Sequence, residues 1–316
     1  MLPEAFDTLW ALSALRVAVE SGMLASVAAA NVPRSAVDLA RDAGLDRSIT
    51  TRIGDVLVAF GVFDTKNGAY VLTDKGRALA GRGDALRADL AVTFGQTRAL
   101  VAQAARGTLA SGWRHDDPEV IRAQADLSYA MTQSMTRPIA EAWPELHERL
   151  GRDGARLVDI GVGGAGGACA LCKQFPKLRI VGVDPLPAAL AEARANVAKH
   201  DLGARIELRA QRGDELPEEA SFDIAFLAAK FLDDHALEST LRVLAKALRP
   251  DGLIMTMAWR DVGEPRATAI SKLRDEMWGA GPRPTEAVTA MLERAGFSRI
   301  RIGPPMGTMQ PILAGQ

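Results

Sequence analysis

A glycine-rich turn between two carboxylates is the part of the sequence with the clearest chemical potential. Residues 157–160 have the pattern of a buried strand, which leads into a turn containing Gly161, Gly163 and Gly166 and then into a helix. Glycines in such a turn let a ligand approach the backbone without a Cβ in the way. Asp184 ends the next predicted strand, about 20 residues on, where a carboxylate can accept hydrogen bonds from both hydroxyls of a ribose. The spacing therefore predicts a cofactor of the adenosine type.

The position of Asp159, just before the turn, favours one such cofactor over another. A dinucleotide such as NAD would bring its pyrophosphate close to this carboxylate, and the negative charges would repel one another. S-adenosylmethionine has no phosphate and carries a sulfonium and an ammonium group, which a nearby carboxylate favours. We therefore expect S-adenosylmethionine as the cofactor. Two structural interpretations stay open: Asp159 bonded only to amides of the loop, and Asp184 capping the next helix.

The elements that must position these residues alternate between short apolar strands and helices from residue 151 onward. This alternation is typical of an α/β fold with a Rossmann-like parallel sheet and crossover helices. The sequence predicts a seven-stranded sheet, with a closing pair of strands near Ile300 and Ile312 and the other strands at 156–160, 178–183, 205–209, 222–228 and 253–258.

The N-terminal part has a different pattern, which predicts mainly helices. Helical spacing predicts helices over residues 5–27, 35–43 and 47–60, and Asn67-Gly68 between two β-prone runs predicts a hairpin. Three helices and a hairpin resemble a winged helix, which often reads DNA through its third helix. That helix offers only Arg47 and Arg52 as cations, so a structural or dimerising role is favoured over DNA binding. Residues 84–150 are helical again, apart from a break at 112–118.

Five blocks in the second half resemble the class I methyltransferases, and particularly the small-molecule O-methyltransferases with an N-terminal winged-helix dimerisation domain. The blocks are 157–163, 181–185, 213–214 with 222–224, 247–252 and 295–297. The resemblance implies a dimerisation domain over residues 1–116 and a catalytic domain over 117–316. It also implies these cofactor contacts: Gly161 and Gly163 with the methionine part, Asp184 with the ribose, Asp214 with the adenine amino group, and Ala228 to Lys230 on the other side. Pro185 and Glu215 are further cofactor-binding candidates.

Catalytic residues are harder to predict, because methyl transfer from a sulfonium needs alignment and exclusion of water more than a general base. Plant-type members of the family carry a His-Asp pair after the fourth strand, whereas the histidine of this sequence is displaced to His235. His235 is a candidate base, but Asp233 or Asp234 as a helix N-cap with His235 solvated explains the pattern equally well. His115, in the irregular loop after Trp113, and Tyr129 are further candidates.

Large apolar side chains near the predicted cofactor could form an acceptor pocket. The candidates are Met131, Met135, Trp259, Trp278 and Met309, although plain core packing explains each of them too. His147 and His200 are expected to be solvated. Cys169 and Cys172 fall in the helix after the glycine turn and are expected to be buried structural thiols. No pattern of metal ligands is present, so no metal is expected.

Composition limits the classes of partner. The chain has 316 residues, with 38 Lys and Arg against 39 Asp and Glu, and its net charge of -1 disfavours nucleic acid and anionic membranes. We expect a cytoplasmic protein, because neither an export signal nor a run of about 20 apolar residues is evident, and the family resemblance implies a homodimer. The predicted function is methylation of an oxygen or nitrogen atom of a small specialised metabolite. Alternatives are cyclisation or another non-methylating reaction with the same cofactor, a cofactor-sensing DNA-binding regulator, and an NAD-dependent oxidoreductase.

Overall fold

In the computed structural model, two units divide the chain within helix α6 (Asp84–Ala105), at Gln96 and Thr97. The structure describes residues 2–30, 32–109, 112–113, 116–279 and 281–316. The division falls about 20 residues before the boundary at residue 116 that the sequence suggested, because the first part of α6 contributes Leu86 and Leu90 to the core of the first unit.

The first unit contains the predicted helices and hairpin, with one correction. The expected single helix over residues 5–27 is two helices, because Gly22 has a φ of 79°, a left-handed conformation that ends the first helix. Ser35 and Asp46 cap the next two helices through side-chain hydrogen bonds to backbone amides. The elements are α1 (Leu2–Glu20), α2 (Met23–Ala29), α3 (Ala36–Ala43), α4 (Arg47–Ala59), β1 (Phe63–Lys66), β2 (Ala69–Leu72) and α5 (Asp74–Ala80).

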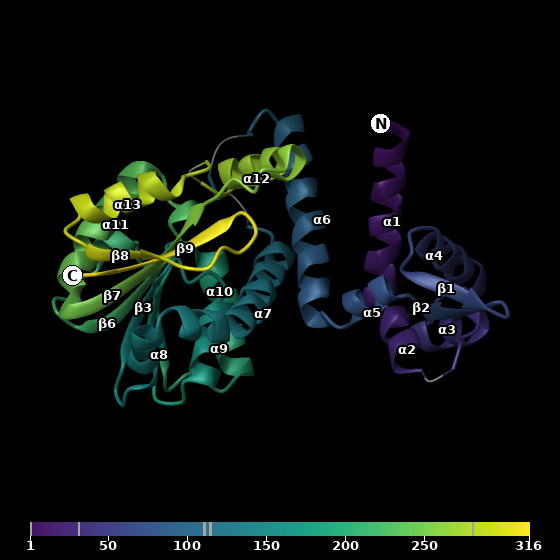
Figure 1. The fold of residues 1–316 in the computed structure, drawn as a ribbon, viewed down its shortest axis with the longest axis horizontal. Coiled ribbons are helices and arrows are strands. Elements are labelled where there is room, and N and C mark those ends of the chain that lie inside the picture. The colour runs from purple at the N-terminus through teal and green to yellow at the C-terminus, as the bar shows by residue number, and fades with distance from the viewer. Residues whose placement is uncertain (1, 31, 110–111, 114–115, 280) are drawn as a thin grey trace. The chain divides into compact units, whose positions relative to one another are not determined.

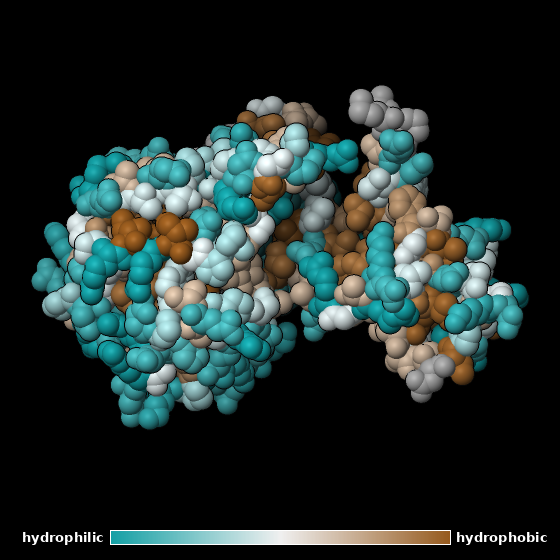
Figure 2. Space-filling view, viewed as in Figure 1, coloured by the Kyte–Doolittle hydropathy of each residue, from teal (hydrophilic) through white to brown (hydrophobic). Residues whose placement is uncertain are grey.

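The surface of the first unit shows no concentration of free positive charge on its third predicted helix, α4. Arg52 pairs with Asp55 of the same helix at 2.8 Å. Apolar side chains are interspersed on the surface of this unit (Figure 2), and α1 exposes Phe6, Leu9 and Trp10. No single helix among the described residues is long and apolar enough to cross a membrane; α1 and α2 together have sufficient length and apolar character, but they are bent by 66°.

The second unit is built on a sheet of seven strands in the described residues, as predicted. The strand order is β5-β4-β3-β6-β7-β9-β8, and β9 runs antiparallel to both of its neighbours, β7 and β8. Of these strands, β3, β6, β7, β8 and β9 can be followed in Figure 1. The strands are β3 (Arg156–Ile160), β4 (Arg179–Val183), β5 (Ile206–Arg209), β6 (Phe222–Leu227), β7 (Leu248–Trp259), β8 (Ser298–Ile302) and β9 (Met309–Gly315).

The chain order reverses between β3 and β6, which are neighbours in the sheet. Ligands of open α/β sheets bind outside the carboxyl ends of the strands at such a switch point. The helices and short turns of the second unit that follow α6 are α7 (Pro118–Ala142), α8 (Pro144–Gly151), α9 (Gly166–Gln174), α10 (Pro187–Lys199), η1 (Gly213–Glu215), η2 (Ala229–Phe231), α11 (Asp234–Ala247), α12 (Pro265–Trp278) and α13 (Thr285–Arg294).

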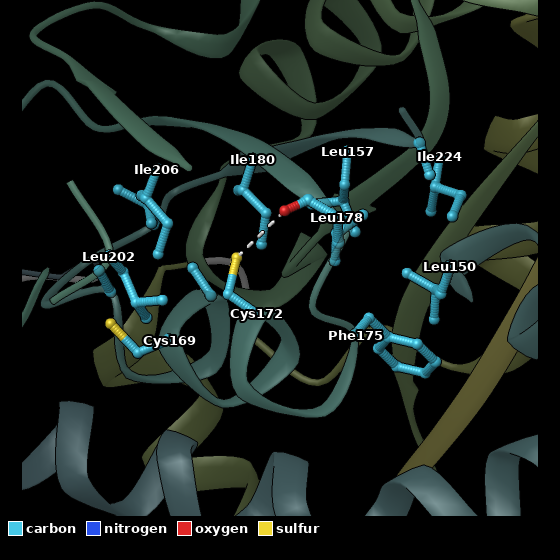
Figure 3. Packing of buried hydrophobic residues seen from close by; sticks show 14 of the residues in the cluster. Leu150, Leu157, Cys169, Cys172, Phe175, Leu178, Ile180, Leu202, Ile206 and Ile224 are labelled. Carbon is cyan, nitrogen blue, oxygen red and sulfur yellow. Dashed lines mark hydrogen bonds between the residues drawn. The ribbon is translucent and has the colours of Figure 1, made fainter. Parts of the chain in front are cut away.

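Side chains alternate between the two faces of the sheet, as strand geometry requires. Leu157 and Ile224 pack on one face with residues of α7 to α10, whereas Val158 and Ala225 pack on the other with α11 and α13. Cys169 and Cys172 lie among the apolar residues of the first face (Figure 3). Both are free and buried, and burial raises the pKa of each thiol, which confirms their expected structural role.

Candidate active site

The turn between β3 and α9 has the open backbone that a ligand site needs. The amides of Gly161 and Val162 donate to the carbonyl of Val183 at 2.9 and 3.0 Å, which ties the turn to the end of β4. Gly161 and Gly163 have φ values of 73° and 56°, a conformation that favours glycine. A Cβ on Gly161 would meet no atom within 4 Å, and one on Gly163 only the Gly161 oxygen at 3.9 Å. The space above these two glycines is therefore open to a ligand.

The later glycines of the turn have a different reason to be glycine. A Cβ on Gly166 would lie 1.8 Å from the carbonyl oxygen of Ala125, and a Cβ on Gly164 would lie 2.6 Å from the Ala125 side chain. Helix α7 thus packs directly on the turn. Glycine at positions 164 and 166 brings α7 to the edge of the sheet, while glycine at 161 and 163 leaves room for a ligand.

Asp184 follows β4 and stabilises the turn. Its carboxylate is buried and accepts hydrogen bonds from the amides of Gly163 at 3.0 Å and Leu186 at 2.9 Å. Burial raises the pKa of this carboxyl, and the two amide donors counteract that rise. Each carboxylate oxygen can accept a second hydrogen bond, so the two hydroxyls of a ribose remain compatible with this geometry.

Asp159 has no such partners. The residue is 6% exposed, and within the part of the chain that the structure describes its carboxylate accepts no hydrogen bond and forms no ion pair. The interpretation that loop amides satisfy it is therefore wrong. Burial first, and the nearby charge of Asp184 second, raise the pKa of Asp159 to about 7. A buried carboxylate without a partner is costly, and a cationic ligand would relieve that cost.

An apolar pocket extends from Asp159 between the sheet and α7 to α9. Met131 and Met135, two of the candidate acceptor residues, lie in its wall. The cavity measures about 110 Å³, close to the roughly 150 Å³ of an apolar cavity that binds benzene in another protein. We call it the apolar pocket; its other lining residues are Thr132, Thr136, Ile139, Ala140, Leu146, His147, Leu150, Leu157, Gly167, Leu171, Phe175, Ile224, Phe226, Met255 and Met257.

A second pocket lies beyond the carboxyl ends of β6 and β7 and carries charged side chains. It brings together the other three candidate acceptor residues, Trp259, Trp278 and Met309, and groups Lys230 with them. Met257 belongs to both pockets. We call this second one the charged pocket; its remaining lining residues are Ala258, Ser271, Arg274, Asp275, Gly281, Arg283 and Thr308.

The ammonium of Lys230 is the central charge of this second pocket. Its Nζ lies 4.0 Å from the ring centre of Trp278 and 3.6 Å from the sulfur of Met309. Burial lowers the pKa of Lys230 to about 8, although the charge of Asp275 acts in the opposite direction. Burial likewise raises the pKa of Asp275. The sequence suggested that Lys230 lines the cofactor, and the structure places it against α12.

Asp214, expected near the adenine, and Glu215, a further cofactor-binding candidate, lie in η1, after β5. Arg212 donates to both oxygens of Asp214, at 2.9 and 2.7 Å, and its backbone amide donates to Glu215 at 2.9 Å. The Arg212 hydrogen bond is the main cause that lowers the pKa of Asp214. Both carboxylates thus have partners within the turn, and neither lines the apolar or the charged pocket.

The three catalytic candidates do not gather at either pocket. His235 is exposed in the first turn of α11, and Asp233 caps that helix by accepting from the Ala236 amide at 2.8 Å, which supports the N-cap interpretation. The ring of Tyr129 stacks on His200 at 5.0 Å, away from the pocket that its neighbour Met131 lines. His115 lies outside the described residues. Nearby in the sequence, Trp113 packs edge-on against Phe231, with the ring centroids 5.4 Å apart.

Sequence reasoning missed several lining residues. His147, expected only to be solvated, is exposed and also lines the apolar pocket. One signal was available on α7, where positions 131, 135 and 139, with 132, 136 and 140, form a stripe at helical spacing. Arg274 and Asp275 gave no signal, because charges on a helix usually face water. Among the described residues, no three His, Cys, Asp or Glu side chains are grouped so that they could hold a metal ion.

Comparisons with known proteins agree with this geometry. Residues 157–252 match a family model described as a methyltransferase domain. The chain is 38% identical over 84 residues to a release factor glutamine methyltransferase of Geobacter sulfurreducens, and this match covers 26% of the chain and 29% of the relative. It is 27% identical over 308 residues to a 3-amino-4-hydroxybenzoate 4-O-methyltransferase of Streptomyces cremeus, covering 91% of the chain and 82% of the relative.

A solved structure extends the similarity to the whole fold. Human N-acetylserotonin methyltransferase in complex with S-adenosylmethionine superposes with a TM-score of 0.73 at 16% identity, covering 100% of this chain and 96% of that one. The predicted fold class, with its helical N-terminal region, is therefore confirmed.

Proposed function

We propose that the protein methylates an oxygen or nitrogen atom of a small aromatic metabolite. The premise is that the chain is an S-adenosylmethionine-dependent methyltransferase with the fold of the small-molecule O-methyltransferases. The observation that supports this best is the unpartnered carboxylate of Asp159 beside the open turn. A phosphate-bearing cofactor would add negative charge there, whereas a sulfonium or ammonium would neutralise the carboxylate.

The residues proposed to hold the cofactor surround the carboxyl ends of β3 to β6. Asp159 would face its cationic end, and Asp184 would accept from the ribose while it holds the Gly163 amide. When bound, the cofactor supplies a methyl group already activated by its positive sulfur. The full proposed set is Asp159, Gly161, Gly163, Asp184, Pro185, Asp214, Glu215 and Ala228.

The apolar pocket would hold the acceptor. Its size suits a single ring, and Met131 and Met135 would pack on that ring and exclude water. Fixing the acceptor oxygen or nitrogen in line with the methyl group is what these walls contribute, since alignment can supply much of the rate. The relative from Streptomyces cremeus is named for methylation of a hydroxyl on such a ring, which favours an aromatic hydroxyl.

We further propose that residues 1–116 form a dimerisation domain and that the protein works as a cytoplasmic homodimer without nucleic acid. The pairing of Arg52 with Asp55 on α4 supports the exclusion of DNA, because it removes one of the two cations of that helix from phosphate contact. Sedimentation of the purified protein and a gel shift with random DNA at physiological salt test both statements.

The decisive experiment combines binding with product analysis. The purified protein is titrated with S-adenosylhomocysteine by calorimetry and then incubated with labelled S-adenosylmethionine and pools of aromatic metabolites. We expect saturable binding and a product that gains one labelled methyl group. Tight binding of NAD without binding of S-adenosylhomocysteine contradicts the proposal, and a product without added methyl indicates the cyclisation alternative.

A further inference from the structure

Lys230 is a half-buried cation without an ion pair. Within the described residues its ammonium forms no ion pair with a carboxylate within 4.0 Å. Its neighbours are instead aromatic rings and a thioether: Trp278 at 4.0 Å, Phe231 at 5.5 Å and the Met309 sulfur at 3.6 Å. An aromatic face stabilises an ammonium only in part, so a charge in this position is costly unless a ligand completes it.

The other charges of the pocket leave it positive. Arg274 lies 4.8 Å over the ring of Trp278, so two cations flank one ring, and Asp275 is the carboxylate that faces them. Arg283 is satisfied separately, by Asp234 and by the carbonyls of Ala229 and Leu232. Lys230 and Arg274 against Asp275 leave one net positive charge, which a single anionic group would neutralise.

The position of Lys230 in the fold connects this charge with the acceptor site. Lys230 follows β6 and Trp259 ends β7, so both lie at the sheet edge where the turn after β3 also lies. Met257 lines the charged pocket and the apolar pocket alike, which makes the two pockets neighbours. A ring in the apolar pocket therefore has a positive site beside it.

We propose that Lys230 binds an anionic oxygen of the acceptor, a carboxylate or a phenolate, and that the enzyme thereby selects acidic aromatic compounds over neutral ones of the same shape. The inference rests on the proposed function, because it describes the acceptor of that same site. Lys230 is thus an acceptor-binding residue. No covalent step is assigned to it.

The test measures binding, so it does not depend on turnover. Two pairs of probes are titrated into the protein saturated with S-adenosylhomocysteine at pH 7: benzoate against benzamide, and 2,4-dinitrophenolate against 2,4-dinitroanisole. The tryptophans at positions 259 and 278 give a fluorescence signal in the pocket itself. The wild type is expected to prefer the anionic member of at least one pair by about tenfold or more. A preference in the first pair indicates that Lys230 binds a carboxylate, and a preference in the second pair indicates a phenolate.

Variants separate binding from a structural role. Lys230→Met removes the charge, and the preference should fall to within about twofold while S-adenosylhomocysteine binds as before. Lys230→Arg should keep the preference. Lys246→Met is the matched control, because Lys246 is an exposed lysine of α11 that lines neither the charged nor the apolar pocket, and the preference should persist. Because the pKa of Lys230 is lowered to about 8, the wild-type preference should decline as pH rises through that value.

Several outcomes overturn the inference. One is a wild type that binds both members of each pair equally, and another is a Lys230→Met variant that keeps the preference. A third is a Lys230→Met variant that has a lower Tm and a reduced affinity for anionic and neutral probes alike, because the role of Lys230 would then be purely structural. Failure of S-adenosylhomocysteine to bind the wild type contradicts the proposed function instead, and the probe titrations without it still report whether the pocket prefers anions.

Discussion

The two pockets on either side of Met257 differ in the sign of their unpaired charge. The apolar pocket ends at Asp159, a buried carboxylate without a partner, whereas the charged pocket surrounds Lys230, an ammonium without an ion pair. Each charge is costly when its pocket holds no ligand, and each would be compensated by a ligand of opposite sign. The comparison suggests that the protein orients its two substrates by charge, with the cationic cofactor at Asp159 and an anionic acceptor at Lys230.

The largest effect on ligand binding is expected when the negative charge of Asp159 is removed. Asp159→Asn keeps the shape of the side chain and should weaken binding of S-adenosylmethionine by about 2–5 kcal/mol, because a buried charge loses its partner. Calorimetric titration measures the change. Asp153→Asn, which removes an exposed carboxylate far from the turn, is the control and should bind normally. Equal affinity of Asp159→Asn and the wild type would show that the carboxylate does not face the cation.

The same substitution should stabilise the protein without ligand. The pKa of Asp159 is raised to about 7 in the fold, so the folded state holds a proton that the unfolded chain releases near pH 4, and stability falls as pH rises between these values. Asp159→Asn avoids that loss. We expect it to be more stable than the wild type by about 1–3 kcal/mol at pH 8 and by less at pH 5, measured by denaturant unfolding. A wild type that is the more stable of the two at pH 8 contradicts this account.

A smaller effect is expected from the ring beneath Lys230. Trp278→Leu removes the aromatic face that favours the charged ammonium. The pKa of Lys230 should then fall further, and the pH at which the preference for anionic probes is lost should move down by about one unit. The variant lacks one of the two pocket tryptophans that report binding, so the affinity for the probes is measured by calorimetry at several pH values. An upward shift would mean that the ring does not stabilise the cation.

The smallest effect is expected at the histidine that the family pattern made a candidate base. His235 is exposed on α11 and lines neither pocket. His235→Ala should leave kcat/KM within about twofold of the wild type, as for a surface substitution away from the site. Steady-state kinetics with the identified acceptor measure it. A loss of a hundredfold or more, with a shifted pH profile, would restore His235 as the base and weaken the case that the two pockets suffice.

Local sequence signals predicted much of the fold. Apolar runs located every strand of the sheet, Asn67-Gly68 located the hairpin, and Ser35 located a helix start, because turns and caps depend on residues close in the chain. The helix break at Gly22 was missed, since the apolar spacing continues across it. The glycine turn with Asp159 and Asp184 was likewise readable, because strand, turn and carboxylates lie within one βαβ segment.

The sequence by itself thus determined the fold class and the glycine turn with its two carboxylates. Only the tertiary structure decided that Asp159 has no partner while Asp184 has two, and that Lys230 lies over Trp278 rather than in water. The physical reason is distance along the chain: Lys230 and Trp278 are brought together by packing of α12 against η2. Whether a charge is paired depends on every element that surrounds it, and no local pattern records that.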